Sequence, residues 1–162
     1  MHAPIAHAAM LIRRPLAEVF QAFVDPAITT RFWFSDSSGP LGPKARVHWT
    51  WRMYGASTEV QVRRFDPDSL ILMDWDLTTH PTEVEWKFTS KEDGTFVEVE
   101  NRGFAGDEAG VRKAIDSATG FTLVLAGAKI WLEHGIEPDF VLDRHPDAVV
   151  PGWQREREGA VA

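Results

Sequence analysis

Between residues 45 and 101, apolar and polar side chains alternate with a period of two. The pattern is clear in ARVHWTW, where Val47, Trp49 and Trp51 share one face. Turn-forming residues such as Pro67 and Asp68 separate the alternating runs. Such runs are typical of antiparallel strands with one buried and one polar face. The sequence therefore predicts a meander of five antiparallel strands, at 45–51, 58–64, 69–77, 82–90 and 95–101.

Helical spacing flanks this meander on both sides. Residues 5–13 predict a first strand, LAEVFQAFV predicts a helix with one apolar face, and a short second helix follows Asp25-Pro26. The next segment, FSDSSGPLG, is typical of turns and predicts a mobile flap. Residues 108–134 predict one helix about 40 Å long, which Asp107 caps and Gly135 ends. Residues 1–135 are thus expected to form one domain, followed by an extension, 136–162, that is partly draped or frayed.

Two glycines, Gly120 and Gly127, lie well inside the segment 118–135 of the long predicted helix, and each costs roughly 1 kcal/mol relative to alanine. On a helical wheel they share a stripe with Val124 and Trp131, whereas Lys129 falls opposite. This helix is large enough to cover the sheet, so we expect the stripe to face the strands. Glycines there permit either dense helix–sheet packing or a cavity, and the residues alone leave both alternatives open.

Aromatic side chains are unusually abundant, with seven tryptophans and ten phenylalanines. Each one alone is more often a core residue than a ligand contact, but together they exceed what a core of this size uses. We interpret them as the lining of a pocket, with Asn101, Thr95, Lys113 and Asp116 as polar anchors. The candidate ligand-binding residues are Trp33, Trp49, Trp51, Trp75, Trp86, Phe88, Asn101, Gly120, Val124, Gly127 and Trp131.

Composition and spacing argue against several other classes of protein. A formal charge of −7 argues against nucleic acid and anionic membranes as main partners. The chain has no cysteine, and its six histidines lack metal-binding spacing, so no metal or cofactor is expected. No apolar run is long enough for a membrane span, and a cytoplasmic location is expected. The pairs Asp74/Asp76 and Glu83/Glu85 have strand spacing, which predicts a solvated sheet face, and no catalytic residue is assigned.

Three segments resemble a known family: RRPLAEVFQAFVDPAITTRFW, NRGFAGDEAG and GFTLVLAGAKIWLEHG. Their order and spacing resemble the START-like (SRPBCC) superfamily, in the branch of the activator of Hsp90 ATPase homologue and polyketide cyclase-like proteins. The resemblance implies an α+β helix-grip fold, in which a curved antiparallel sheet wraps around a long C-terminal helix, with two short helices after the first strand. It also favours a cavity over dense packing at the glycines. In this branch a Gly-Gly pair usually opens the second strand, whereas this chain has GPLGPKARV at that place.

The leading functional hypothesis is non-enzymatic binding of a small apolar ligand, which is aromatic, isoprenoid or lipid-like, between the sheet and the C-terminal helix. One alternative is an Hsp90-type co-chaperone or interaction protein, acting as a monomer or homodimer. The other is a cyclase or dehydratase acting on a polyketide-like substrate. A cavity of several hundred Å³ favours binding or cyclisation, and a filled core favours the chaperone partner.

Overall fold

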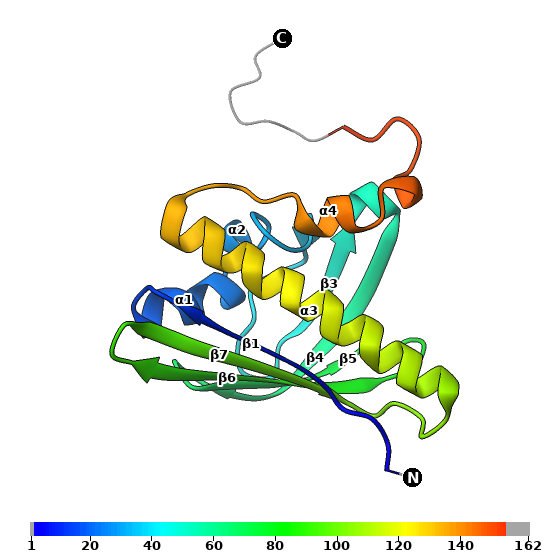
Figure 1. The fold of residues 1–162 in the computed structure, drawn as a ribbon, viewed down its shortest axis with the longest axis horizontal. Helices are drawn as coiled ribbons and strands as arrows, with labels where there is room; N and C mark the ends of the chain where they lie inside the picture. Colours follow the sequence, from blue (N-terminus) through cyan, green and yellow to red (C-terminus); the bar gives the residue numbers. More distant parts are fainter. Residues whose placement is uncertain (1, 155–162) are drawn as a thin grey trace.

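The computed structural model describes residues 2–154 and combines one large antiparallel sheet with a long helix (Figure 1). The strands are β1 (Ala6–Ile12), β2 (Asp36–Ser37), β3 (Arg46–Trp51), β4 (Ala56–Asp66), β5 (Leu70–Trp75), β6 (Thr82–Lys91) and β7 (Gly94–Arg102). The helices are α1 (Leu16–Val24), α2 (Pro26–Thr29), α3 (Glu108–His134) and α4 (Phe140–Arg144), with short 3₁₀ turns η1 (Arg52–Tyr54) and η2 (Pro146–Ala148).

The sheet has seven strands in the order β1-β7-β6-β5-β4-β3-β2, and every neighbouring pair is antiparallel. The five predicted strands are present as β3 to β7, and β1 pairs with β7 rather than with its neighbour in sequence. The sheet curves around α3, with β3 and β4 rising beside the helix (Figure 1). The predicted α+β helix-grip fold is therefore confirmed.

One strand lies where the sequence predicts only a flap. Asp36 pairs with Thr50 and Ser37 pairs with Trp49, which adds β2 to the edge of the sheet. Ser35 and Ser38 extend this attachment, because their backbone amides donate to the carbonyls of Thr50 and His48 at 2.9 and 3.0 Å. A two-residue strand has too little sequence for a periodic signal, since its stability comes from the neighbouring strand.

The aromatic core lies between the concave face of the sheet, α1 and the middle of α3. Alternation in β6 buries Val84, Trp86 and Phe88, and α1 packs Phe20 and Phe23 against them. The ring centroids of Phe20 and Phe88 are 5.0 Å apart in an edge-to-face arrangement. Such geometry is the favoured one for aromatic pairs, so these rings stabilise the helix–sheet interface.

Both ends of α3 follow the predicted capping. The Asp107 carboxylate accepts a hydrogen bond from the Gly110 amide at 2.8 Å. Gly135 has a φ of +66°, and its amide donates to the Trp131 carbonyl at 2.9 Å. These contacts satisfy terminal backbone groups that would otherwise lack partners. They account for why the helix spans the expected residues.

The rotation of α3 differs from the wheel prediction. Lys129, expected to face away from the sheet, donates from Nζ to the Leu11 carbonyl of β1 at 2.9 Å. Glu133 accepts from the Arg13 amide at 3.0 Å, so the same edge of the helix follows β1. The prediction turned Lys129 away from the strands, whereas the C-terminal half of the helix is anchored through this side to the β1 edge.

The helix glycines consequently do not face the sheet. A Cβ atom at Gly127 would lie 3.2 Å from both Phe32 Cβ and Pro138 Cγ. A Cβ atom at Gly120 would lie 2.9 Å from Arg144 Nη1. The segment after Gly135 runs back along α3 and forms α4 and η2 (Figure 1). The glycines therefore give room to this returning segment and to Phe32. Of the extension 136–162 that is predicted to be partly draped or frayed, residues 155–162 lie outside the described residues.

Candidate functional site

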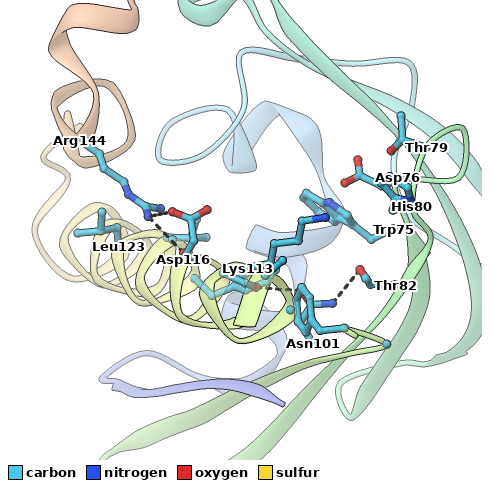
Figure 2. A pocket seen from close by; sticks show the side chains of 18 of the residues that line it. Trp75, Asp76, Thr79, His80, Thr82, Asn101, Lys113, Asp116, Leu123 and Arg144 are labelled. Carbon is cyan, nitrogen blue, oxygen red and sulfur yellow. Dashed lines mark hydrogen bonds and ion pairs between the residues drawn. The ribbon is translucent and has the colours of Figure 1, made fainter. Parts of the chain in front are cut away.

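A cavity of about 700 Å³ opens beside the N-terminal half of α3 (Figure 2). The residues that line it come from α3, from the loop between β5 and β6, from the end of β7 and from α4. The sheet curves away from the helix here, while α4 covers the space from the other side. Volumes of this size are typical of sites that bind small organic molecules.

Three aromatic rings form one wall of the cavity. The rings of Trp33 and Trp75 are nearly parallel, with centroids 5.7 Å apart and an interplanar angle of 11°. Phe121 of α3 stands edge-on to both indoles, with each centroid distance at 6.1 Å. Leu123 and Val124 extend the apolar lining along the helix. The wall thus offers flat, polarisable surface to a planar or chain-like apolar ligand.

A chain of hydrogen bonds forms the polar end of the cavity. Asn101 is 4% exposed, and its amide nitrogen donates to Thr82 Oγ1 at 2.9 Å and to the Glu83 carbonyl at 3.0 Å. Ser117 of α3 donates from Oγ to Asn101 Oδ1 at 2.8 Å. Asn101 therefore joins β6, β7 and α3 at one point, and its own amide is fully hydrogen-bonded.

Charged side chains lie around the opening. Arg144 of α4 forms an ion pair with Asp116 of α3 and also donates to the Asp116 carbonyl at 3.2 Å. Lys113, one helical turn from Asp116, is exposed and lines the cavity. His80 lies across the opening, on the loop between β5 and β6. The opening therefore carries groups of both signs.

Asp76 corrects one expectation from the sequence. Asp74 does lie on the polar face, where its carboxylate accepts from Arg63 Nε at 2.9 Å. Asp76 has a φ of +56°, in the left-handed region, and its carboxylate accepts the Thr58 hydroxyl. The chain leaves β5 after Trp75, so strand alternation ends and Asp76 lines the cavity instead. Aspartate tolerates this backbone conformation better than most residues.

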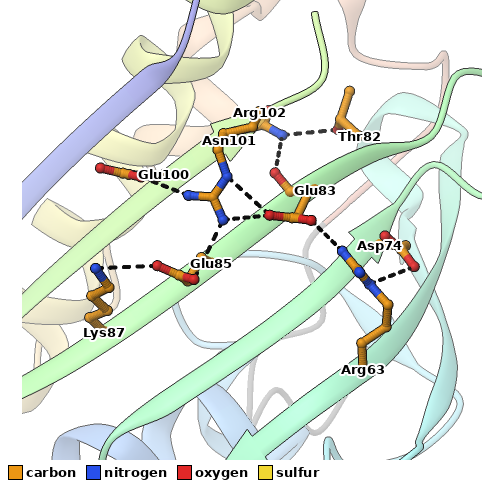
Figure 3. A network of polar contacts seen from close by, with 9 residues as sticks. All are labelled: Arg63, Asp74, Thr82, Glu83, Glu85, Lys87, Glu100, Asn101 and Arg102. Atoms are coloured by element: carbon orange, nitrogen blue, oxygen red, sulfur yellow. Dashed lines mark hydrogen bonds and ion pairs between the residues drawn. The ribbon is translucent and has the colours of Figure 1, made fainter.

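The polar face of the sheet carries a separate ion-pair network (Figure 3). Arg102 pairs with Glu83, Glu85 and Glu100, and Arg63 pairs with Asp74 and Glu83. Hydrogen bonds from Arg102, and then from Arg63, hold the pKa of Glu83 below its ordinary value. Glu83 therefore stays ionised and paired at neutral pH, and the network agrees with the predicted solvated face.

The predicted site residues divide into two groups. The cavity is lined by Trp33, Trp75, Asn101, Gly120 and Val124. The others lie outside it, namely Trp49, Trp51, Trp86, Phe88, Gly127 and Trp131. Most residues of the second group belong to the packed core. The cavity lies only beside the N-terminal half of α3, so these side chains do not reach it.

The residues outside the cavity have identifiable packing roles. Trp49 and Trp86 are 1% and 2% exposed and belong to the core with Phe88. Trp51 lies behind the aromatic wall, its ring centroid 6.2 Å from that of Trp75. Trp131 packs under the Arg31 guanidinium, with Cζ 5.3 Å from the ring centroid.

Several residues that line the cavity were not predicted from the sequence, among them those of the C-terminal segment. The unpredicted lining residues include Tyr54, Asp76, Thr79, His80, Phe104, Leu123, Val141, Arg144 and His145. Tyr54 holds α4 in place, since its hydroxyl donates to the carbonyls of Val141 and Leu142, the latter at 2.8 Å. Burial is the main cause that raises the pKa of Tyr54, so this donor stays protonated. The sequence feature that could have indicated a docked C-terminal segment is the apolar triplet 140–142, which lies between Pro138 and Pro146.

A match to a known family covers most of the chain. Residues 13–128 match the family described as Activator of Hsp90 ATPase homolog 1-like protein. The chain belongs to this family. The match begins just after β1 and runs from α1 through most of α3, and it confirms the resemblance carried by the opening helix and the last helix. No protein of curated function matches the sequence significantly.

Solved structures share the fold of this Activator of Hsp90 ATPase homolog 1-like chain. SSP2350 from Staphylococcus saprophyticus is 26% identical, with a TM-score of 0.74 over 83% of this chain and 96% of that one. The Aha1 dimer from Colwellia psychrerythraea is 18% identical, with a TM-score of 0.69 over 82% and 98%. DynU16, a protein of the dynemicin biosynthetic locus, is 17% identical, with a TM-score of 0.74 over 82% of this chain and 48% of that one.

The family match ends before the returning segment begins. Val141, Arg144 and His145 line the cavity and lie beyond residue 128. The Activator of Hsp90 ATPase homolog 1-like part thus supplies β2 to β7, the aromatic wall and Asn101, and the C-terminal segment adds the cover. Within residues 2–154, no helix is both long and apolar enough to cross a bilayer, and no cluster of potential metal ligands is present.

Proposed function

We propose that this protein binds a small, largely apolar ligand in the cavity beside α3, without catalysing a reaction on it. The observation that carries the proposal is the hollow of about 700 Å³ walled by the stacked Trp33–Trp75 pair. Apolar space of that volume, bounded by a few placed polar groups, is what small-molecule sites share. The flat wall favours an aromatic or other planar framework, with isoprenoid or lipid-like chains as the alternatives.

The arrangement of the cavity supports binding over a filled packing interface. Asn101, Thr82 and Ser117 form a satisfied hydrogen-bond chain that holds the two sides of the hollow together. The ion pair between Arg144 and Asp116 fastens α4 across the opening. Elements that hold a space open from both sides are consistent with a preformed binding site.

The alternative functions have weaker support. A chaperone-related role accords with the family description and with the dimeric Aha1 relative, but it does not require a hollow of this size. DynU16 places a protein of this fold in a small-molecule biosynthetic locus, which supports a small organic ligand. The proposal keeps the cytoplasmic location and the monomeric or homodimeric state expected from the sequence.

A neutral aromatic probe tests the proposal directly. Isothermal calorimetry with 2-(1-naphthyl)ethanol is expected to show saturable binding, and the probe is expected to quench tryptophan emission from the Trp33–Trp75 wall. Leu123→Trp places a large ring in the cavity and is expected to weaken binding about tenfold or more, a loss of at least about 1.4 kcal/mol. Leu123 is half-buried and lines the cavity, so the larger ring takes up space that the probe needs.

Thr122→Trp is the matched control, because it introduces the same ring one residue away at an exposed position of α3. Thermal melts of both variants establish that each is folded. Binding that is lost only in Leu123→Trp supports the cavity as the site. Absence of binding to the parent, or equal affinity in all three proteins, would overturn the proposal.

A further inference from the structure

Lys113 is a cation without an ion-pair partner among the described residues, and it lies at the cavity. Its side chain extends from α3 toward the Trp75 side of the hollow (Figure 2). The neighbouring carboxylates on the same helix are engaged elsewhere: Asp116 pairs with Arg144, and Asp107 caps the helix through the Gly110 amide. Among residues 2–154, Lys113 therefore forms no ion pair with the acids beside it.

The hydrogen-bond chain next to Lys113 has a defined direction. The Glu83 carbonyl can only accept, so the nitrogen of Asn101 must face it, at 3.0 Å. Asn101 then donates to Thr82 Oγ1 and accepts from the Ser117 hydroxyl. The Ser117 proton is therefore already engaged in this chain of hydrogen bonds. The Thr82 hydroxyl is the last member, and its own proton has no acceptor among residues 2–154.

Thr82 and Lys113 thus both offer donors at one end of the hollow. Donors in a chain of hydrogen bonds polarise one another, which strengthens the free proton of Thr82 as a donor. At the same opening, Asp76 already accepts the Thr58 hydroxyl. The donors Lys113 and Thr82 therefore suit this end of the cavity to a group that accepts hydrogen bonds and carries negative charge.

We propose that the natural ligand is an amphipathic acid, whose apolar rings lie on the Trp33–Trp75 wall and whose carboxylate is bound by Lys113 and Thr82. This inference deepens the proposed binding function and rests on it. The competing possibility is an amine, which the aromatic wall and the Asp76 carboxylate would hold through cation–π and charge contacts. Lys113 disfavours that ligand, because like charges in the same hollow repel.

The test compares three naphthyl probes that differ only in the terminal group: 1-naphthylacetic acid, 2-(1-naphthyl)ethanol and 2-(1-naphthyl)ethylamine. By calorimetry at low ionic strength, the acid is expected to bind the parent about tenfold tighter than the alcohol, as a charge-assisted hydrogen bond implies. The preference should shrink at high salt, because Lys113 is exposed and its charge is screened. The amine is expected to bind most weakly.

Variants assign the preference to one side chain. Lys113→Met is expected to reduce acid binding about tenfold and to leave alcohol binding unchanged. Lys113→Arg keeps the charge and should keep the preference. Lys87→Met is the matched control, since it removes one exposed positive charge from the opposite face of the sheet (Figure 3). It is expected to preserve the preference for the acid.

The outcomes separate this inference from the proposed function. If the alcohol binds and the acid binds no tighter, or if Lys113→Met keeps the preference, the inference is overturned while the cavity remains a binding site. If the amine binds tightest, Asp76 is the anchor and the inference is likewise overturned. If no probe binds the parent, the proposed function itself fails.

Discussion

Gly127 lies where α3 meets two other segments at once, Phe32 before β2 and Pro138 after the helix. Neither neighbour is the sheet that the helical wheel places opposite it. Both approach so closely that hydrogen is the side chain that fits without displacement, since Cβ contacts of 3.2 Å are already tight. The glycine thus serves close packing of the returning segment, and the low helix propensity is offset by that contact.

Gly127→Leu is accordingly expected to destabilise the protein by about 1–3 kcal/mol, because the new side chain overpacks this contact. The gain in helix propensity, somewhat under 1 kcal/mol, does not compensate. Urea unfolding measures the change, with Thr122→Leu as the control at an exposed position of the same helix. A Gly127→Leu protein as stable as the parent would show that Phe32 and Pro138 can move away at little cost.

Individual cavity residues differ in how readily the sequence reveals them. Trp33, Trp75 and Asn101 were predictable, since aromatic abundance and strand phase both depend on local sequence. Asp76 was not, because a single left-handed residue at the end of β5 turns its side chain away from the face that alternation assigns. Backbone turns of that kind leave no periodic signal in a non-glycine residue.

At the scale of elements, the C-terminal segment is the feature that the sequence describes least well. The long helix and the meander were predictable because their periods repeat many times. The five-residue helix α4 has no such repeat, and helices that short are stable only when docked. Its docking depends on Tyr54, Asp116 and Gly120, all distant in sequence, so local propensity could not predict it.

Tyr54→Phe removes the hydroxyl that donates to the Val141 and Leu142 carbonyls. We expect faster amide hydrogen exchange throughout 139–148, with a loss of about 0.5–1.5 kcal/mol in the local opening free energy. The exchange of β6 and β7 should be unchanged, because α4 packs on the other side of the cavity. Arg112→Ala, which removes an exposed ion pair with Glu108 on α3, is the control. Equal exchange at α4 in parent and Tyr54→Phe would contradict this role for Tyr54.

At the scale of the whole molecule, the free energy of unfolding depends on pH through the ion pairs on the polar face of the sheet. The pKa of Glu83 is lowered mainly by its hydrogen bond from Arg102. A carboxyl whose pKa is lower in the folded state stabilises the folded protein. This contribution is complete at pH values above the unfolded-state pKa of about 4.3. That contribution is lost as the pH falls through the lower folded value.

Glu83→Gln is therefore expected to reduce the free energy of unfolding at pH 7 by less than about 1 kcal/mol, since the network is partly exposed. The difference from the parent should shrink between pH 7 and pH 2, as the pH falls through the lowered folded-state pKa of Glu83. Urea titrations at both pH values measure it, and Glu92→Gln in the exposed turn after β6 is the charge-matched control. Identical pH dependence in both variants would show that Arg102 does not hold Glu83.

The pairing of β1 with β7 also bears on how the chain reaches this fold. Met10 pairs with Val97, and Ala6 pairs with Asn101, so these contacts join the first strand of the described chain to its last strand. Closing so long a loop costs more entropy than closing any of the hairpins between β3 and β7. Until β7 is in place, β1 is a strand without a neighbour, with backbone groups open to other chains. The rate of folding should thus be governed by this late pairing, in the slower range that non-local contacts impose on mixed α/β domains.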